Sequence, residues 1–280
     1  MRKIKSETVI NTVGNLCAET NFELPADVLK SLEKNIVLEK DIAKDILKEI
    51  IENADIARKE RIPLCQDTGT ANFFIKLGRD VEIENGDICA AVNKGVSLGY
   101  TNNYLRKSIV SDPIIERKNT KDNTPANIYI DIVSGDKIEI TFLPKGGGSE
   151  NASALKMLTP SIGWDGIKEF VLSAINDKGR NACPPLVIGV GIGGDFASVG
   201  LMSKKALLRE IGSENKNIFY DGKEIELLND INKLNIGPMG MGGKTTALAV
   251  FIETKPAHIA SLPVAVSIQC HSYRRKTIII

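Results

Sequence analysis

Three cysteines stand at positions from which a thiolate could point into a cleft. Cys65 lies in the segment P-L-C-Q-D-T-G, Cys183 precedes two prolines, and Cys270 ends the strand-like run VSIQC. Their wide spacing matches no zinc finger, CxxC redox pair or ferredoxin run, so spacing alone also allows three unrelated thiols. If the three thiolates held a four-iron cluster, one iron would lack a protein ligand and could act as a Lewis acid on a substrate oxygen.

The remaining two cysteines have a simpler interpretation. Cys17 and Cys89 lie in helical text, and we expect both to be small buried apolar side chains. The total of five is odd and no export signal is evident, so we expect a reducing cytoplasm with free or metal-bound thiols.

Other polar side chains could supply acid–base chemistry and substrate binding. Asp67 lies two residues from Cys65 and could transfer a proton, although Asp-Thr-Gly is also typical of an Asx turn. Arg106 could bind a carboxylate through two hydrogen bonds or could be a solvated surface charge. His258 stands in otherwise apolar text, where it could be functional or simply structural.

A triple glycine marks a possible anion site. The segment K-G-G-G-S-E-N (145–151) follows a strand-like run and could open a helix, with Ser149 or Asn151 as its cap. Backbone N–H groups at such a place can hold a carboxylate, whereas the alternative is a flexible turn.

Two further glycine-rich segments resemble nucleotide motifs. G-V-G-I-G-G (189–194) satisfies G-x-G-x-x-G between a strand and a helix. A Cys-Pro-Pro run precedes it and no early βαβ unit is evident, which favours tight strand-to-helix packing. G-P-M-G-M-G-G-K-T-T misses the phosphate-loop pattern by one residue, because Pro238 stands where the first glycine is required.

The elements that must position these groups follow from periodicity. Ile42, Ile46, Leu47 and Ile50 recur at helical spacing, so the first sixty residues are expected to be mainly helical. S-G-D between two strand-like runs predicts a β-hairpin. We therefore expect one mixed α/β domain over residues 1–280, with a helical N-terminal section. The expected strands are TANFFIKLG, ANIYIDIV, KIEITFLP, PPLVIGVGIGG, ALAVFIET, LPVAVSIQC and the closing III. The expected later helices are DICAAVNKGVSLGY, GWDGIKEFVLSAINDKGR, FASVGLMSKKALLREIG and KEIELLNDINKLN.

Composition excludes several classes of protein. The apolar content of 42% and charged content of 25% over 280 residues are ordinary for a soluble globular chain. A formal net charge of +1 gives no reason to expect nucleic acid, a membrane surface or an acidic partner. No apolar stretch is long enough to span a bilayer.

Taken together, five segments resemble the class I, iron–sulfur-dependent fumarate hydratases. The resemblance is to the α subunit of the two-subunit type, which is related to the L(+)-tartrate dehydratase α subunit. It covers almost the whole chain, and several long motifs in the right order are far more specific than any one of them. The segments are PLCQDTGTANFF, FLPKGGGSENASALKML, ACPPLVIGVGIGGDF, GPMGMGGKTTALAV and KPAHIASLPVAVSIQCHSYRR.

The resemblance implies a cofactor, a set of site residues and the fold of the class I fumarase N-terminal domain. It implies a [4Fe–4S] cluster with three ligands: Cys65, Cys183 and Cys270. The residues implied to contact a dicarboxylate substrate are Gln66, Arg106, Gly146, Gly147 and His258. Asp67 is then a candidate proton-transfer residue.

The resemblance also implies a partner. Single-chain members carry a further C-terminal domain that supplies more basic substrate ligands and a candidate catalytic threonine, so a separate β subunit is expected to provide them here in a hetero-oligomer. The implied reaction is the reversible hydration of fumarate to L-malate. The alternatives are the corresponding reaction of tartrate or mesaconate, a nucleotide-binding oxidoreductase that uses the 189–194 segment, and a binding or assembly module.

Overall fold

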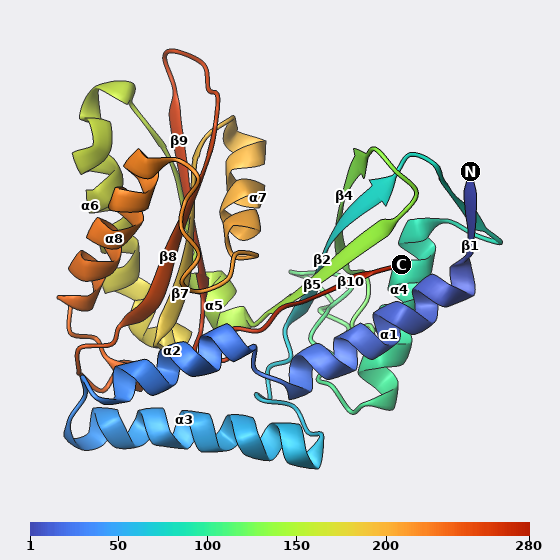
Figure 1. Cartoon of the computed structure of the whole chain (residues 1–280), viewed down its shortest axis with the longest axis horizontal. Coiled ribbons are helices and arrows are strands. Elements are labelled where there is room, and N and C mark those ends of the chain that lie inside the picture. Colours follow the sequence, from blue (N-terminus) through green and yellow to red (C-terminus); the bar gives the residue numbers. More distant parts are fainter. The chain divides into compact units, whose positions relative to one another are not determined.

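The computed structural model describes residues 1–280 and divides them into two compact units (Figure 1). Unit 1 comprises Met1–Pro25, Ala54–Gly147 and Arg274–Ile280, and unit 2 comprises Ala26–Asn53 and Gly148–Tyr273. Eight α-helices and three sheets confirm the predicted mixed α/β class. That residues 1–280 form one family domain stays a prediction. No helix combines the length and apolar character needed to cross a bilayer.

Unit 1 is a four-stranded sheet with two helices against it and a small accessory strand pair. The sheet has the order β10-β5-β2-β4, and β1 pairs with β3 in parallel. Its core includes Phe73 of β2 stacked on Phe142 of β5, with ring centroids 4.8 Å apart. The elements are β1 (Arg2–Lys5), α1 (Ser6–Phe22), β2 (Thr70–Gly78), β3 (Val81–Glu84), α4 (Ile88–Asn102), β4 (Asn127–Val133), β5 (Ile138–Lys145) and β10 (Lys276–Ile279).

The predicted β4–β5 hairpin is wrong, because β2 lies between the two strands. Ile75 of β2 stands opposite Ile130 of β4 in a parallel pairing and opposite Ile140 of β5 in an antiparallel one. The buried, apolar β2 thereby pairs both of its backbone edges, whereas a β4–β5 hairpin would leave one edge open. The link between β4 and β5 crosses the end of β2, where a Cβ on Gly78 would lie 2.4 Å from the carbonyl oxygen of Gly135. The S-G-D signal correctly marks a turn but not the partner of the strand that follows.

Unit 2 is a second four-stranded sheet, β6-β9-β7-β8, with helices on both faces (Figure 1). Strand β7 runs parallel to β8 and antiparallel to β9. Helix α7 covers one face, and α6 and α8 cover the other. The elements are α2 (Ala26–Ile36), β6 (Ala154–Leu158), η1 (Pro160–Ile162), α6 (Gly163–Lys178), η2 (Gly179–Ala182), β7 (Leu186–Gly193), α7 (Phe196–Ala206), α8 (Ile218–Asn232), η3 (Pro238–Gly240), β8 (Ala247–Lys255) and β9 (Leu262–Gln269).

Two helices run across the sequence boundary between the units: α3 (Asp41–Glu60) and the short α5 (Gly147–Ala152). The predicted α3 is confirmed, and two of the four apolar residues expected on its buried face, Leu47 and Ile50, are buried. Ile46 is half-buried and Ile42 is 54% exposed. Ala43 takes the first position of the buried i, i+4, i+7 stripe that continues with Leu47 and Ile50.

Candidate active site

The P-L-C-Q-D-T-G segment forms a tight loop that leads from α3 into β2 in unit 1. The Leu64 N–H donates to the Asn21 carbonyl at 2.9 Å, which fixes the start of the loop. Cys65 is half-buried and Gln66 beside it is exposed. Gly69 ends the loop with φ +74°, and a Cβ there would lie 2.6 Å from the Lys145 backbone. Only glycine satisfies both requirements, so the loop conformation is specified by its last residue.

The Asp67 carboxylate joins this loop to the glycine turn after β5. Oδ1 accepts the Gly69 N–H at 3.1 Å, which is the Asx turn that the sequence allowed. Oδ2 accepts the Gly147 N–H at 2.7 Å, and a Cβ on Gly146 would lie 3.1 Å from the same oxygen. Unit 1 therefore brings together three predicted site residues: Asp67, Gly146 and Gly147. The N–H of Gly147, which was expected to face a substrate, donates to the Asp67 carboxylate.

Helix α5 begins at Gly147, so the predicted cap is wrong. Ser149 and Asn151 lie inside the helix and not at its start. The reason is that Asp67, from a distant part of the sequence, accepts the first N–H of the helix. A local cap is unnecessary when a tertiary contact satisfies that donor.

Arg106 lies beyond α4, close in the fold to the Asp67 loop. Its side chain is exposed, and its carbonyl oxygen accepts the Thr68 hydroxyl at 3.2 Å. The backbone of Arg106 is therefore tied to the residue after Asp67, which leaves the guanidinium at the surface of unit 1.

Buried polar side chains that the sequence did not single out donate hydrogen bonds to the backbone of the Asp67 loop. Arg274 is 4% exposed, donates from Nη2 to the Asp67 carbonyl at 3.1 Å and donates from Nε to Asn21 Oδ1 at 3.0 Å. The Tyr100 hydroxyl donates to the Thr68 carbonyl at 3.0 Å. In the sequence, Arg274 looks like an ordinary surface charge and Tyr100 like an ordinary core aromatic. No local sequence signal therefore distinguishes them.

Cys183 and Cys270 lie at one end of the unit 2 sheet. Cys183 stands just before β7 with φ +53° and Cys270 just after β9, and these strands are antiparallel neighbours. The His271 N–H donates to the Cys183 carbonyl at 3.0 Å. His271 Nδ1 lies 3.1 Å from the same oxygen and donates to it when that nitrogen carries the proton. The fold of unit 2 thus brings two of the three predicted cluster ligands to neighbouring positions.

None of the five cysteines forms a disulfide, and neither unit by itself gathers three side chains that could hold a metal. Cys65 belongs to unit 1, whereas Cys183 and Cys270 belong to unit 2. The prediction for Cys17 is confirmed, since it is buried, and burial raises the pKa of its thiol. The prediction for Cys89 is wrong, because it lies on the solvent side of α4, whose buried face includes Val92 and Val96.

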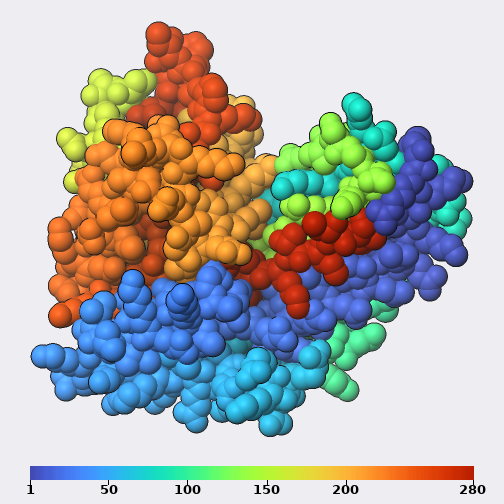
Figure 2. Space-filling model, viewed as in Figure 1, coloured from blue at the N-terminus to red at the C-terminus, as the bar shows by residue number.

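His258 lies in the loop between β8 and β9, the tip of which projects from the surface of unit 2 (Figure 2). Its Nδ1 accepts the Ala260 N–H at 3.1 Å, and its side chain is exposed. Strand β9 begins at Leu262 and separates this loop from Cys270 by roughly 25 Å, at about 3.3 Å per residue. Unit 2 does not bring His258 to Cys183 and Cys270, and its predicted contact with substrate stays a prediction.

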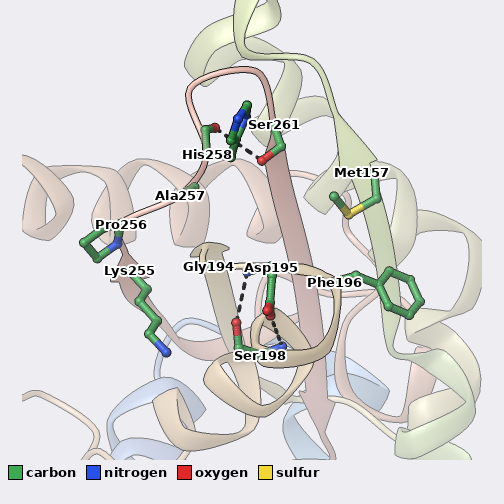
Figure 3. Close-up of a pocket in the computed structure, with 10 residues that line it drawn as sticks. All are labelled: Met157, Gly194, Asp195, Phe196, Ser198, Lys255, Pro256, Ala257, His258 and Ser261. Atoms are coloured by element: carbon green, nitrogen blue, oxygen red, sulfur yellow. Dashed lines mark hydrogen bonds between the residues drawn. The ribbon is translucent and has the colours of Figure 1, made fainter.

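His258 instead lines a pocket at the carboxyl ends of the parallel strands β7 and β8 (Figure 3). The pocket has a volume of about 460 Å³. Asp195 caps α7 by accepting the Ser198 N–H at 2.7 Å, and the Asp195 N–H in turn donates to the Ser198 hydroxyl at 3.0 Å. Hydrogen bonds from Ser198, with a smaller contribution from the charge of Lys255, hold the pKa of Asp195 below its usual value. The polar groups on this side of the pocket are therefore engaged in capping the helix.

The glycines of the 189–194 segment are explained by close packing. A Cβ on Gly189 would lie 2.1 Å from the Ser203 carbonyl oxygen, and one on Gly191 would lie 2.5 Å from that of Val199, both in α7. These distances favour the packing interpretation over a dinucleotide site, because the glycines let the helix approach the strand.

The second nucleotide-like segment binds a carboxylate of the chain itself. Glu39 is 5% exposed, and Oε2 accepts the Lys244 N–H at 3.1 Å while Oε1 accepts the Thr245 N–H at 2.5 Å. A Cβ on Gly243 would lie 2.8 Å from Glu39 Oε2. N–H groups that a phosphate would need are thus already occupied.

Comparisons with known proteins show the family of the chain. The family model described as "Fumarate hydratase (Fumerase)" matches residues 10–279. The putative L(+)-tartrate dehydratase subunit alpha of Methanocaldococcus jannaschii is 44% identical over 225 residues, which is 78% of this chain and 78% of that protein. The L(+)-tartrate dehydratase subunit alpha of Escherichia coli K12 is 34% identical over 220 residues, which is 78% of this chain and 72% of that protein. The chain therefore belongs to the fumarate hydratase (Fumerase) family.

Proposed function

We propose that the chain is the α subunit of an iron–sulfur hydro-lyase that catalyses the reversible hydration of fumarate to L-malate together with a separate β subunit. The observation that carries the proposal is the family match over residues 10–279. The names of the relatives, which are alpha subunits, support a two-subunit enzyme.

The proposed cluster ligands are Cys65, Cys183 and Cys270, and their chemistry fits a cluster. None of the three forms a disulfide, and Cys183 and Cys270 stand at the same end of antiparallel neighbour strands. When bound, a cluster with three thiolate ligands supplies an open iron that acts as a Lewis acid on the substrate hydroxyl.

The residues of unit 1 would bind and orient the dicarboxylate. Arg106 has an exposed guanidinium, suited to hold a carboxylate through two hydrogen bonds. Gln66 is exposed beside Cys65 and can donate from its amide. Gly146 and Gly147 lack side chains next to the Asp67 carboxylate, so a substrate could approach the backbone there. We also propose that His258 contacts the substrate, a role that rests on the resemblance alone.

Asp67 is the proposed proton-transfer residue of this chain. Each carboxylate oxygen accepts one backbone N–H and keeps a second lone pair, so Oδ1 or Oδ2 can take a proton while the carboxylate stays fixed. A fixed base reduces the entropy cost of reaching the reacting geometry.

A second substrate is favoured by a specific observation. The relatives at 34–44% identity are named for L(+)-tartrate, which differs from malate by one hydroxyl group. The same residues would then eliminate water from tartrate, and the pocket shape would set the preference.

Anaerobic purification of the chain co-expressed with a β subunit tests this proposal. A brown protein that contains iron and sulfide is expected, together with hydratase or dehydratase activity when fumarate, tartrate and mesaconate are assayed in turn. A colourless protein that binds NAD would contradict it and support the oxidoreductase alternative.

A further inference from the structure

We propose that Asn123 is a positioning residue that holds the Arg106 loop at a fixed place relative to the Asp67 loop. The inference rests on the proposed function, because it assigns a purpose to the spacing between a carboxylate-binding group and a proton-transfer group. Its evidence lies entirely within unit 1.

The Asn123 side chain is fully buried and links the two loops through one amide group. Its Oδ1 accepts the Ser108 N–H at 2.7 Å, and its Nδ2 donates to the Gly69 carbonyl at 3.1 Å. Ser108 lies two residues after Arg106, and Gly69 lies two residues after Asp67. Both loops are therefore anchored to the same side chain.

A second connection runs parallel to the first. The Thr68 hydroxyl donates to the Arg106 carbonyl at 3.2 Å, and Thr68 is 1% exposed. The Tyr100 hydroxyl lies 3.0 Å from the Thr68 carbonyl and 3.3 Å from that of Gly69. The backbone on both sides of the proposed site is thus tied together by side chains that water does not reach.

Asparagine is the residue type that this link requires. It offers one acceptor and two donors on a short side chain, whereas aspartate would lose the donor to Gly69 and leucine would lose both bonds. Asn123 has φ +64°, a left-handed conformation that asparagine tolerates better than most residues.

The spacing between the loops matters because a dicarboxylate must be held at one end while a proton moves near the other. Arg106 is proposed to bind the substrate, so a misplaced guanidinium weakens substrate binding. We therefore expect the loss of the Asn123 link to act mainly through Arg106 and to raise KM more than it lowers kcat.

A double-mutant cycle in the co-expressed α–β complex tests the inference. Arg106→Ala is expected to raise KM about tenfold or more, and Asn123→Ala to raise KM about tenfold with a smaller effect on kcat. In the double variant the Arg106→Ala effect should largely disappear, because the guanidinium is already misplaced.

Asn232→Ala is the matched control. Asn232 in unit 2 also links backbone groups, since it accepts the N–H groups of Thr246 and Ala247 at 2.8 Å each. The Asn232→Ala variant should have a Tm lowered by about as much as that of Asn123→Ala, and its KM should be unchanged.

Thr68→Val keeps the inference testable if Asn123→Ala fails to fold, because it removes only a hydroxyl. It should raise KM about threefold, and hydrogen exchange should quicken in residues 105–110. Multiplicative, independent effects of Asn123→Ala and Arg106→Ala, or unchanged exchange in Thr68→Val, would overturn the inference. An Arg106→Ala variant with normal KM would instead contradict the proposed substrate role of Arg106.

Discussion

Replacing Asp67 with asparagine tests whether the two hydrogen bonds accepted by its carboxylate stabilise the fold. Both oxygens accept backbone N–H groups, from Gly69 at 3.1 Å and from Gly147 at 2.7 Å. Asparagine has only one oxygen, so in either orientation one of these N–H groups would face an NH₂ group. The substitution Asp67→Asn therefore removes one bond and weakens the other.

The magnitude follows from those two contacts. A hydrogen bond to a charged group contributes about 1.5–3 kcal/mol, and a neutral one about 0.5–1.5 kcal/mol. Losing one hydrogen bond to a charged group and converting the other into a neutral one costs about 2.5–4.5 kcal/mol in total. Asp67 is half-buried and Gly147 is exposed, so water can hydrogen-bond to the groups that lose their partner. We therefore expect the free energy of unfolding to fall by about 1–2 kcal/mol. The corresponding fall in Tm is about 2–6 °C.

Thermal unfolding of the purified chain measures this loss, and Asp195→Asn is its control. Asp195 uses one oxygen to accept the Ser198 N–H at the start of α7, and asparagine caps helices about as well as aspartate. Equal Tm values for the Asp67→Asn and Asp195→Asn variants would refute the hydrogen-bond reasoning. In the α–β complex, Asp67→Asn should also lower turnover at least about a hundredfold with the cluster intact, and unchanged turnover would remove Asp67 from the mechanism.

Three further predictions concern packing, pH and thiol reactivity. Gly189→Ala should destabilise the chain by about 1–3 kcal/mol in chemical denaturation because its Cβ would meet a carbonyl of α7, whereas Gly222→Ala, with open space around it, should stabilise it by up to about 1 kcal/mol. Hydrogen bonds from two lysines and a tryptophan lower the pKa of Glu226 to about 2. The stabilising effect of the Glu226 carboxylate is therefore present above about pH 5 and lost as the pH falls toward 2. The difference in Tm between the wild type and Glu226→Gln should shrink over that range. Iodoacetamide should label exposed Cys89 in the native chain and leave buried Cys17 unlabelled, as mass spectrometry of the digested protein would show.

Local patterns predicted the elements well because their physical basis is local. The strand expected at TANFFIKLG is β2, and the closing isoleucines form part of β10. Apolar periodicity and flanking glycines or prolines act within a few residues, so a single sequence contains that information.

Pairings between distant segments could not be predicted in the same way. The β4–β5 hairpin was wrong because the best partner for both strands was β2, which lies earlier in the chain. The cap of α5 was wrong because Asp67, 80 residues away, accepts the N–H of Gly147. Cys89 was expected to be buried because its neighbours are apolar, but it lies on the opposite side of α4.

The reactive side chains of the candidate site could be predicted from the sequence, but the buried side chains that hold its loops in place could not. Cysteine, aspartate and glycine stand in motifs that suggest reactive groups, and the structure joins Asp67 to Gly147. Asn123 and Arg274 lie in no such motif, and their importance appears only when their buried hydrogen bonds are known.

The most direct test of the proposed function is the rate of water elimination by the anaerobically purified α–β complex, compared with variants in which Cys65, Cys183 or Cys270 is replaced by serine. The proposal predicts that the wild-type complex forms an unsaturated dicarboxylate from malate or tartrate and that each serine variant loses both iron and activity. A complex that retains iron and full activity after all three single replacements, or one that contains the cluster and eliminates water from neither substrate, would contradict it.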